Sequence, residues 1–156
     1  MKHTSYADMS CSIAQALEAI GPWWAFLIIR DAFLGIRRFS DFERSLGIAK
    51  TTLTSRLRLL VEAGVMEKVP DSAGSKYHEY QLTEKGADLL PVLVALSQWG
   101  EQWTGTTHDE AIVVVDTATG TQIPRQIIRD ETGAPIPLDR LTYLPRSELA
   151  EPSSSD

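Results

Sequence analysis

The chain has 156 residues, 43% of them hydrophobic, and it carries 15 basic and 21 acidic side chains for a formal net charge of −6. This length suits one ordinary domain with an appendage, and no apolar run approaches the ~20 residues of a membrane-spanning helix. The one cysteine, Cys11, excludes an internal disulfide framework. Because the first ten residues also lack the apolar stretch of a secretory signal, we expect a cytoplasmic protein without a membrane partner.

Helical periodicity runs through the first half of the chain and predicts helices at about residues 11–20, 23–34, 41–46 and 49–63. The third helix has the pattern of a capping box, in which Ser40 accepts from a helical N–H and Glu43 reaches back to the cap. Gly35 and Gly64 are well placed to end the second and fourth helices. A short helix joined closely to a longer one in this way is typical of a helix-turn-helix.

The fourth predicted helix has two different faces. Leu53, Leu57 and Leu60 recur at helical spacing and are expected to face the core, which leaves short polar and basic side chains on the outside. A helix of this kind can enter the major groove of DNA with its N-terminal half. The candidate contacts to base edges or phosphates on this helix are Lys50, Thr51, Thr52, Thr54, Ser55 and Arg58.

The net acidic charge does not exclude DNA, because salt screens charges beyond ~8–10 Å and local charge decides the attraction for phosphate. Between Gly35 and Leu60, six basic residues stand against two acidic ones, a local charge of +4. Residues 104–156 carry four basic and nine acidic residues, a charge of −5. Arg37 and Arg38, just before the third helix, are therefore further candidates for phosphate contacts.

Two alternating segments, 65–69 and 77–82, predict a β-hairpin after the helix-turn-helix. The residues between them have the composition of a turn. A hairpin in this place is the wing of a winged helix. Ser75, Lys76 and His78 are candidates for phosphate or minor-groove contacts, and an exposed solvated loop is a nearly equal alternative.

Thr83 is expected to cap a long helix over residues 84–103, kinked at Pro91. The apolar residues that recur along this helix include Leu89, Leu93, Leu96 and Trp99. They provide more apolar surface than one small winged-helix domain can easily cover. The pattern therefore predicts a homodimer held mainly by this helix, together with the N-terminal helix.

The last third of the chain repeats a turn pattern. Thr119, Gly120 and Ile123 correspond to Thr132, Gly133 and Ile136 at a constant offset, which predicts two small hairpins. The turns resemble the knuckles of a zinc ribbon, but the ligand positions hold Asp116, Thr119, Arg129 and Thr132. Arginine cannot bind zinc, and threonine is a poor ligand. We therefore expect a β appendage without a metal ion or another cofactor.

Several segments follow one another in a specific order and spacing: Leu27–Asp31, Arg38–Phe42, Leu53–Leu57, Leu60–Val65, Tyr80–Gly86 and Leu90–Leu93 with Trp99-Gly100. Through these segments the first hundred residues, about two thirds of the chain, resemble the HxlR family of winged helix-turn-helix transcriptional regulators. The resemblance implies an α+β fold, a winged helix-turn-helix with a long C-terminal dimerisation helix. It also implies a homodimeric repressor or activator that binds near-palindromic operators in double-stranded DNA.

Pattern and resemblance together divide the chain into three parts. Residues 1–104 are expected to form an HxlR-type winged-helix domain for DNA binding and dimerisation. Residues 105–146 form a degenerate zinc-ribbon-like β appendage without metal, beyond the family core, and residues 147–156 form a flexible tail.

The function predicted from these patterns is sequence-specific transcriptional regulation, with repression favoured, and not enzymatic catalysis. One alternative is a winged helix that grips a protein partner without specific DNA binding. Another is a thiol-dependent enzyme that uses Cys11, although no base is evident near it. Cys11 is also a candidate sensor of a thiol-reactive signal, against the alternative of a buried structural cysteine. The four tryptophans, Trp23, Trp24, Trp99 and Trp103, either line a site for a small-molecule effector or pack in the core and the dimer interface.

Overall fold

The chain divides into two compact units, Met1–Ile112 and Val113–Asp156. The computed structural model describes residues 6, 8–71, 74, 76–105 and 113–148. The elements of the first unit are α1 (Ser12–Ile20), α2 (Trp24–Phe33), α3 (Phe39–Leu46), α4 (Lys50–Glu62), β1 (Met66–Pro70), β2 (His78–Leu82), α5 (Glu84–Ala87) and α6 (Leu90–Trp103). Helices with a two-stranded antiparallel sheet confirm the predicted α+β winged-helix class.

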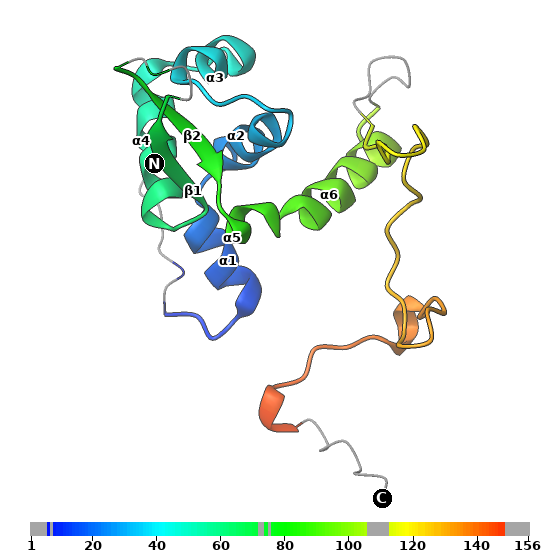
Figure 1. Ribbon diagram of the computed structural model, residues 1–156. Coiled ribbons are helices and arrows are strands. Elements are labelled where there is room, and N and C mark those ends of the chain that lie inside the picture. The colour runs from blue at the N-terminus through cyan, green and yellow to red at the C-terminus, as the bar shows by residue number, and fades with distance from the viewer. Residues whose placement is uncertain (1–5, 7, 72–73, 75, 106–112, 149–156) are drawn as a thin grey trace, which may run out of the picture. The chain divides into compact units, whose positions relative to one another are not determined.

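One hydrophobic core holds the first unit together. Ile28 of α2, Phe42 of α3 and Leu57 of α4 are at most 1% exposed and belong to a single cluster. In Figure 1, α2, α3 and α4 lie close to one another and the β1–β2 hairpin lies alongside α4. Burial of each such side chain stabilises the fold by about 1.5–3 kcal/mol.

The wing is a five-residue antiparallel ladder that runs from the pair Met66 and Leu82 to the pair Pro70 and His78. The chain just before α3 adds to the free edge of β2. Arg38 forms a single β-bridge with Glu79, and the Tyr80 N–H donates to the Arg37 carbonyl oxygen at 2.8 Å. The entry to the helix-turn-helix and the wing therefore share backbone hydrogen bonds.

The predicted capping box before α3 is wrong. Arg38 is the N-cap residue in an extended conformation, no side chain caps the helix, and α3 begins at Phe39. Because the backbone of Arg38 is fixed by its bridge to β2, the helix starts two residues earlier than the pattern suggests. Ser40 consequently lies inside the first turn of the helix.

The predicted long helix is in fact two helices. Thr83 caps the first as expected, since its hydroxyl accepts from the Gly86 N–H at 3.2 Å. Helix α5 then ends after one turn, and Pro91 lies in the first turn of α6 instead of at a kink. Proline has no N–H to donate to the preceding turn, so it suits the start of a helix and breaks a continuous one.

Short polar contacts tie the end of α4 to the start of α5. The Thr83 hydroxyl donates to the Gly64 carbonyl oxygen at 2.7 Å, and the Lys85 ammonium donates to the Ala63 carbonyl oxygen at 2.7 Å. Gly86 is buried against the Val65 carbonyl oxygen. These contacts satisfy carbonyl groups that the last turn of α4 leaves without an intrahelical partner.

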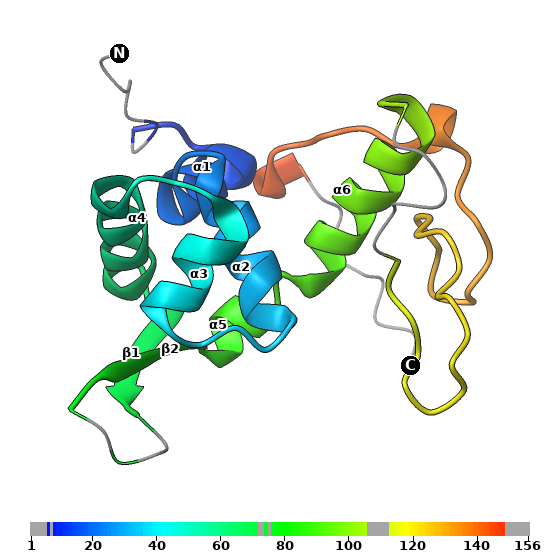
Figure 2. The same cartoon turned by 90° about the horizontal axis from the view of Figure 1, so that it is seen from above.

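Helix α6 packs on the core only through its start. Leu89 and Leu93, expected at the dimer interface, are partly buried against the core cluster. Farther along, α6 runs away from the core, as Figure 2 shows, and presents an apolar stripe at helical spacing. The residues of this α6 stripe are Val92, Leu96, Trp99 and Trp103, which are 50–65% exposed.

Among the described residues, no helix taken singly has the length and apolar content to cross a membrane. Helices α1 and α2 have that length and apolar content only when they are counted together, and the chain bends by 75° between them.

The second unit confirms the two repeated turns. In the first, Gly120 N–H donates to the Asp116 carbonyl oxygen at 2.7 Å; in the second, Gly133 N–H donates to the Asp130 carbonyl oxygen at 2.9 Å. Each turn is closed by one β-bridge, Val115 with Gln122 and Arg129 with Pro135. Hydrogen bonds from the Thr132 hydroxyl and from nearby backbone N–H groups lower the pKa of Asp130. Over residues 113–148 no side chain is buried, and the predicted tail beyond residue 148 lies outside the described residues.

We predict that Gly86→Ala destabilises the protein by about 1–3 kcal/mol, because the new Cβ would collide with the Val65 carbonyl oxygen, which belongs to the backbone and cannot turn aside. Urea denaturation followed by circular dichroism measures the change. Gly100→Ala in α6 is the matched control, since its Cβ meets nothing closer than the Thr104 hydroxyl at 4.0 Å. That control should gain about 0.5–1 kcal/mol from helix propensity. An unchanged midpoint for Gly86→Ala would contradict the packing described.

Candidate nucleic-acid interface

Helix α4 turns its leucines inward and its polar residues outward. Leu53, Leu57 and Leu60 are at most 1% exposed, and their burial fixes the rotation of the helix about its axis. The exposed residues of this helix are Lys50, Thr51, Thr54, Arg58 and Glu62. Lys50, Thr54 and Arg58 follow one another at a spacing of four residues, so they line one face. This arrangement is the one that the leucine spacing predicts.

Two of the predicted contact residues are less accessible than the sequence suggests. Thr52 and Ser55 are half-buried, and the Ser55 hydroxyl donates to the Thr52 carbonyl oxygen at 2.9 Å. A hydroxyl bonded to its own helix backbone is less available to a base edge. Thr51 and Thr54 are therefore the short side chains best placed to reach the floor of a groove.

Two of the three basic residues of α4, Lys50 and Arg58, take part in exposed ion pairs. Lys50 Nζ lies 4.0 Å from Glu43 Oε2, and Arg58 Nε lies 3.5 Å from Glu62 Oε1. The side chains of Lys50 and Arg58 are 75% and 71% exposed. Ion pairs in water are weak, because both partners remain well solvated when they separate. A phosphate can therefore replace either carboxylate at little cost.

The wing carries two lysines, Lys68 on β1 and Lys76 near the tip. The Lys76 side chain is exposed, and its ammonium lies 5.7 Å from the centre of the Tyr77 ring. His78, the first residue of β2, is exposed as well, whereas Ser75 lies outside the described residues.

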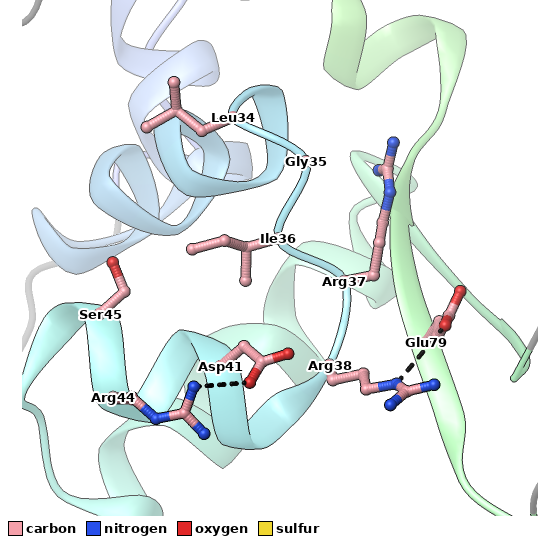
Figure 3. Close-up of a pocket in the computed structure, with 9 residues that line it drawn as sticks. All are labelled: Leu34, Gly35, Ile36, Arg37, Arg38, Asp41, Arg44, Ser45 and Glu79. Atoms are coloured by element: carbon pink, nitrogen blue, oxygen red, sulfur yellow. Dashed lines mark ion pairs between the residues drawn. The ribbon is translucent and has the colours of Figure 1, made fainter.

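Arg37 and Arg38 lie beside an open cleft of about 550 Å³ between α2, α3 and β2 (Figure 3). Their side chains point in different directions: Arg37 extends along β2, and Arg38 reaches across to Glu79. Arg38 Nη2 donates to both carboxylate oxygens of Asp71, at 3.0 and 3.2 Å, and its Nε lies 3.7 Å from Glu79 Oε1. The hydrogen bond that Arg38 donates to Asp71 is the main cause that raises the pKa of Arg38.

The sequence did not indicate Asp71 and Glu79 as residues of this site. Their side chains are only 3% and 9% exposed, although Asp71 sits in a segment with turn composition. The sequence shows a basic pair before α3 and two acidic residues, Asp71 after the first strand and Glu79 on the second. The contact between Arg38 and Asp71, 33 residues apart, does not follow from the sequence, because it depends on how the wing packs beside α3.

The predicted sensor and effector residues occupy separate places. Cys11 is exposed at the N-cap of α1, not buried as a structural cysteine would be. Trp23 and Trp24 line an apolar hollow of about 400 Å³ with Pro22 and Leu27. Trp99 and Trp103 do not line it, so the described hollow is not the site shared by two helices that the four tryptophans suggested. Within the described part of the chain, no group of three or more His, Cys, Asp or Glu side chains could hold a metal ion.

Comparison with known proteins places this site in context. The model of the HxlR-like helix-turn-helix family matches residues 19–108, more than half of the chain. The HTH-type transcriptional regulator Rv3095 of Mycobacterium tuberculosis is 50% identical over 92 residues, which are 59% of this chain and 58% of the relative. The chain thus matches less than two thirds of that relative's length.

Two solved structures extend the comparison. The crystal structure of PA1607, provisionally assigned as a transcription factor, is 43% identical with a TM-score of 0.83 and covers 92% of this chain and 99% of its own. A match of that extent has to include residues after Val113. The redox regulator HypR in its reduced form is 28% identical with a TM-score of 0.55, over 61% of this chain and 95% of its own.

Proposed function

Because the chain belongs to the HxlR-like helix-turn-helix family, whose members are transcriptional regulators and not enzymes, we propose that it binds DNA sequence-specifically as a homodimer. The exposed polar face of α4 opposite its buried leucines is the observation that carries this proposal. Its site is a near-palindromic operator in double-stranded DNA, and the protein acts in the cytoplasm. Repression is the direction that we favour, since a protein seated on an operator denies that DNA to other proteins.

The division of labour on DNA follows from side-chain chemistry. Lys50 and Arg58 on α4, Arg37 before α3 and Lys76 on the wing supply positive charge to phosphates, which fixes the position of the protein on the duplex. Thr51 and Thr54 supply hydroxyl and methyl groups to base edges, including the methyl group of thymine. Helix α4 enters the major groove with its N-terminal half.

The α6 stripe supports a dimer. Val92, Leu96, Trp99 and Trp103 are each at least half exposed and lie on one face of a helix that leaves the core. A contiguous apolar stripe of this kind on a soluble domain marks an interaction surface. A second copy of the same helix covers it by two-fold symmetry, which sets two α4 helices about one DNA turn, ~34 Å, or a multiple of it apart.

The second unit is a metal-free β appendage that modulates assembly or effector access and does not contact DNA. Residues 104–156 carry a net charge of −5, which repels phosphate. Its two turns are held by backbone hydrogen bonds between glycine and aspartate residues.

Cys11 is the candidate for a thiol-reactive signal, and the hollow beside Trp23 and Trp24 is the candidate for a small-molecule effector. Cys11 is exposed and can meet an oxidant without local unfolding. The similarity to HypR, a protein described as a redox regulator, supports this part of the proposal.

We predict specific binding to the DNA upstream of the protein's own gene, measured by fluorescence anisotropy between 50 and 200 mM salt, a range chosen because phosphate contacts are strongly salt-dependent there. The logarithm of the affinity should fall linearly with the logarithm of salt concentration, by ~0.9 per neutralised phosphate.

Thr51→Ala should lose ~1–3 kcal/mol of binding free energy on the preferred sequence, whereas Lys50→Ala should weaken binding to all sequences and reduce the salt slope by about 1. Equal loss on every sequence for Thr51→Ala would show that this residue does not read bases. No preference over unrelated DNA at low salt would favour the protein-interaction alternative.

We predict that Leu96→Asp converts a dimer into a monomer in sedimentation equilibrium, because the substitution places a charge in an apolar interface. Gln102→Asp is the control, since this exposed side chain lies roughly a quarter turn round the helix from the stripe. A wild-type protein that remains monomeric at every concentration would rule out the dimer and, with it, the need for a palindromic operator.

We predict that truncation after Thr104 leaves both dimerisation and operator affinity in place, because the core cluster, α4, the wing and the α6 stripe all precede it. Sedimentation and anisotropy on the shortened chain measure the two properties separately. Loss of DNA binding by a folded, dimeric truncation would make the second unit part of the DNA-binding surface.

A further inference from the structure

The root of the wing holds two carboxylates in a place with little water. Asp71 follows β1 and Glu79 lies in β2, with side chains 3% and 9% exposed. Arg38 reaches both of them from the N-cap of α3. This Arg38–Asp71–Glu79 cluster, called the wing clamp below, joins the helix-turn-helix to the wing by side chains where the Arg38–Glu79 bridge already joins them by backbone.

The wing clamp differs from the ion pairs of α4 in the exposure of its acids. The carboxylates that pair with Lys50 and Arg58 are 32% and 60% exposed, so water solvates them when their cation leaves. The Asp71 carboxylate is almost fully removed from water. If Arg38 left it for a DNA phosphate, a desolvated charge would lose its guanidinium, which is costly. A phosphate therefore competes poorly for Arg38.

The clamp is also connected to Lys76, the lysine near the tip of the wing. The Asp71 N–H donates to the Tyr77 carbonyl oxygen at 3.1 Å and thereby closes the turn that carries Lys76. Tyr77 directly follows Lys76, and its neighbour His78 begins β2. Holding Asp71 in place fixes both ends of this turn with respect to α3.

We propose that Arg38 is a positioning residue: it clamps the wing through Asp71 and Glu79 so that Lys76 meets a phosphate at a fixed place relative to α4. Arg38 then contributes to DNA affinity through Lys76 and not by contacting phosphate itself. This inference rests on the proposed DNA-binding function.

The wing clamp predicts that loss of its acidic residues weakens DNA binding, although charge alone predicts that it strengthens binding. Asp71→Asn removes a negative charge from a DNA-binding protein, so charge alone would strengthen binding. Loosening the wing instead weakens it, because the Lys76 contact is lost. We expect roughly 3- to 10-fold weaker operator binding for Asp71→Asn and for Glu79→Gln, with a salt slope smaller by about 1.

Asp41→Asn is the matched control. Asp41 also pairs with an arginine near the same cleft, Arg44 at 3.2 Å, but its side chain is 40% exposed (Figure 3). Its attraction for Arg38 is weaker than that of Asp71 or Glu79, and it forms no ion pair with the described residues of the wing. Removing its charge should leave binding equal to that of the wild type or slightly stronger. The comparison separates the loss of a charge from the loss of the clamp.

A double-mutant cycle with Lys76→Ala tests whether the clamp acts through the wing. In the Lys76→Ala protein, Asp71→Asn should cost almost nothing further, since the contact that it positions is already absent. Additive losses, or tighter binding and a steeper salt slope for Asp71→Asn, would overturn the proposal and return Arg38 to the direct phosphate contacts.

Amide hydrogen exchange gives a readout that needs no DNA. The Tyr80 N–H, bonded to the Arg37 carbonyl oxygen, should exchange faster in Asp71→Asn than in the wild type or in Asp41→Asn. Unchanged exchange would overturn the clamp even if the protein binds DNA. Failure of the wild type to prefer its own upstream DNA would instead refute the proposed function and leave the exchange result to decide whether the clamp exists.

Discussion

Burial of the α4 leucines determines which side chains this protein presents to its surroundings. Leu53, Leu57 and Leu60 are packed into the core, and a rotation of α4 by one residue would expose a leucine while pushing a polar or charged group inward. Each of those changes costs more than any polar contact on the outer face supplies. The orientation of the outer face is therefore set from inside the protein. Residues such as Thr51 and Thr54 are free to change without altering the fold.

Exposure of the carboxylate separates two kinds of ion pair around the same helix-turn-helix. Pairs whose acid is solvated, such as Arg58 with Glu62, can be exchanged for a partner outside the protein. Pairs whose acid is buried, such as Arg38 with Asp71, belong to the architecture. A count of arginines and lysines treats all of them alike. The charge available to a ligand is thus smaller than the sequence suggests.

Periodicity was sufficient to locate α1, α2, α4, the hairpin and the two turns of the second unit, because each is governed by neighbours in the chain. The errors arose where distant segments intervene. Ser40 fails as a cap because β2 fixes the backbone of Arg38. Leu89 and Leu93 are partly buried against the core cluster, so the chain itself already covers part of the apolar surface that was assigned to a second subunit. The contacts of Asp71 and Glu79 with Arg38 could not be predicted, because they depend on the packing of the wing beside α3.

The absence of buried side chains over residues 113–148 affects how the chain should respond to heat and denaturant. Heat-capacity change and denaturant sensitivity scale with the surface that unfolding newly exposes. The second unit already exposes most of its apolar surface in the single chain and adds little to either quantity. The heat-capacity change and denaturant sensitivity of the monomer should therefore be those of its first unit alone. Both should be smaller than the values expected from the full length of the chain.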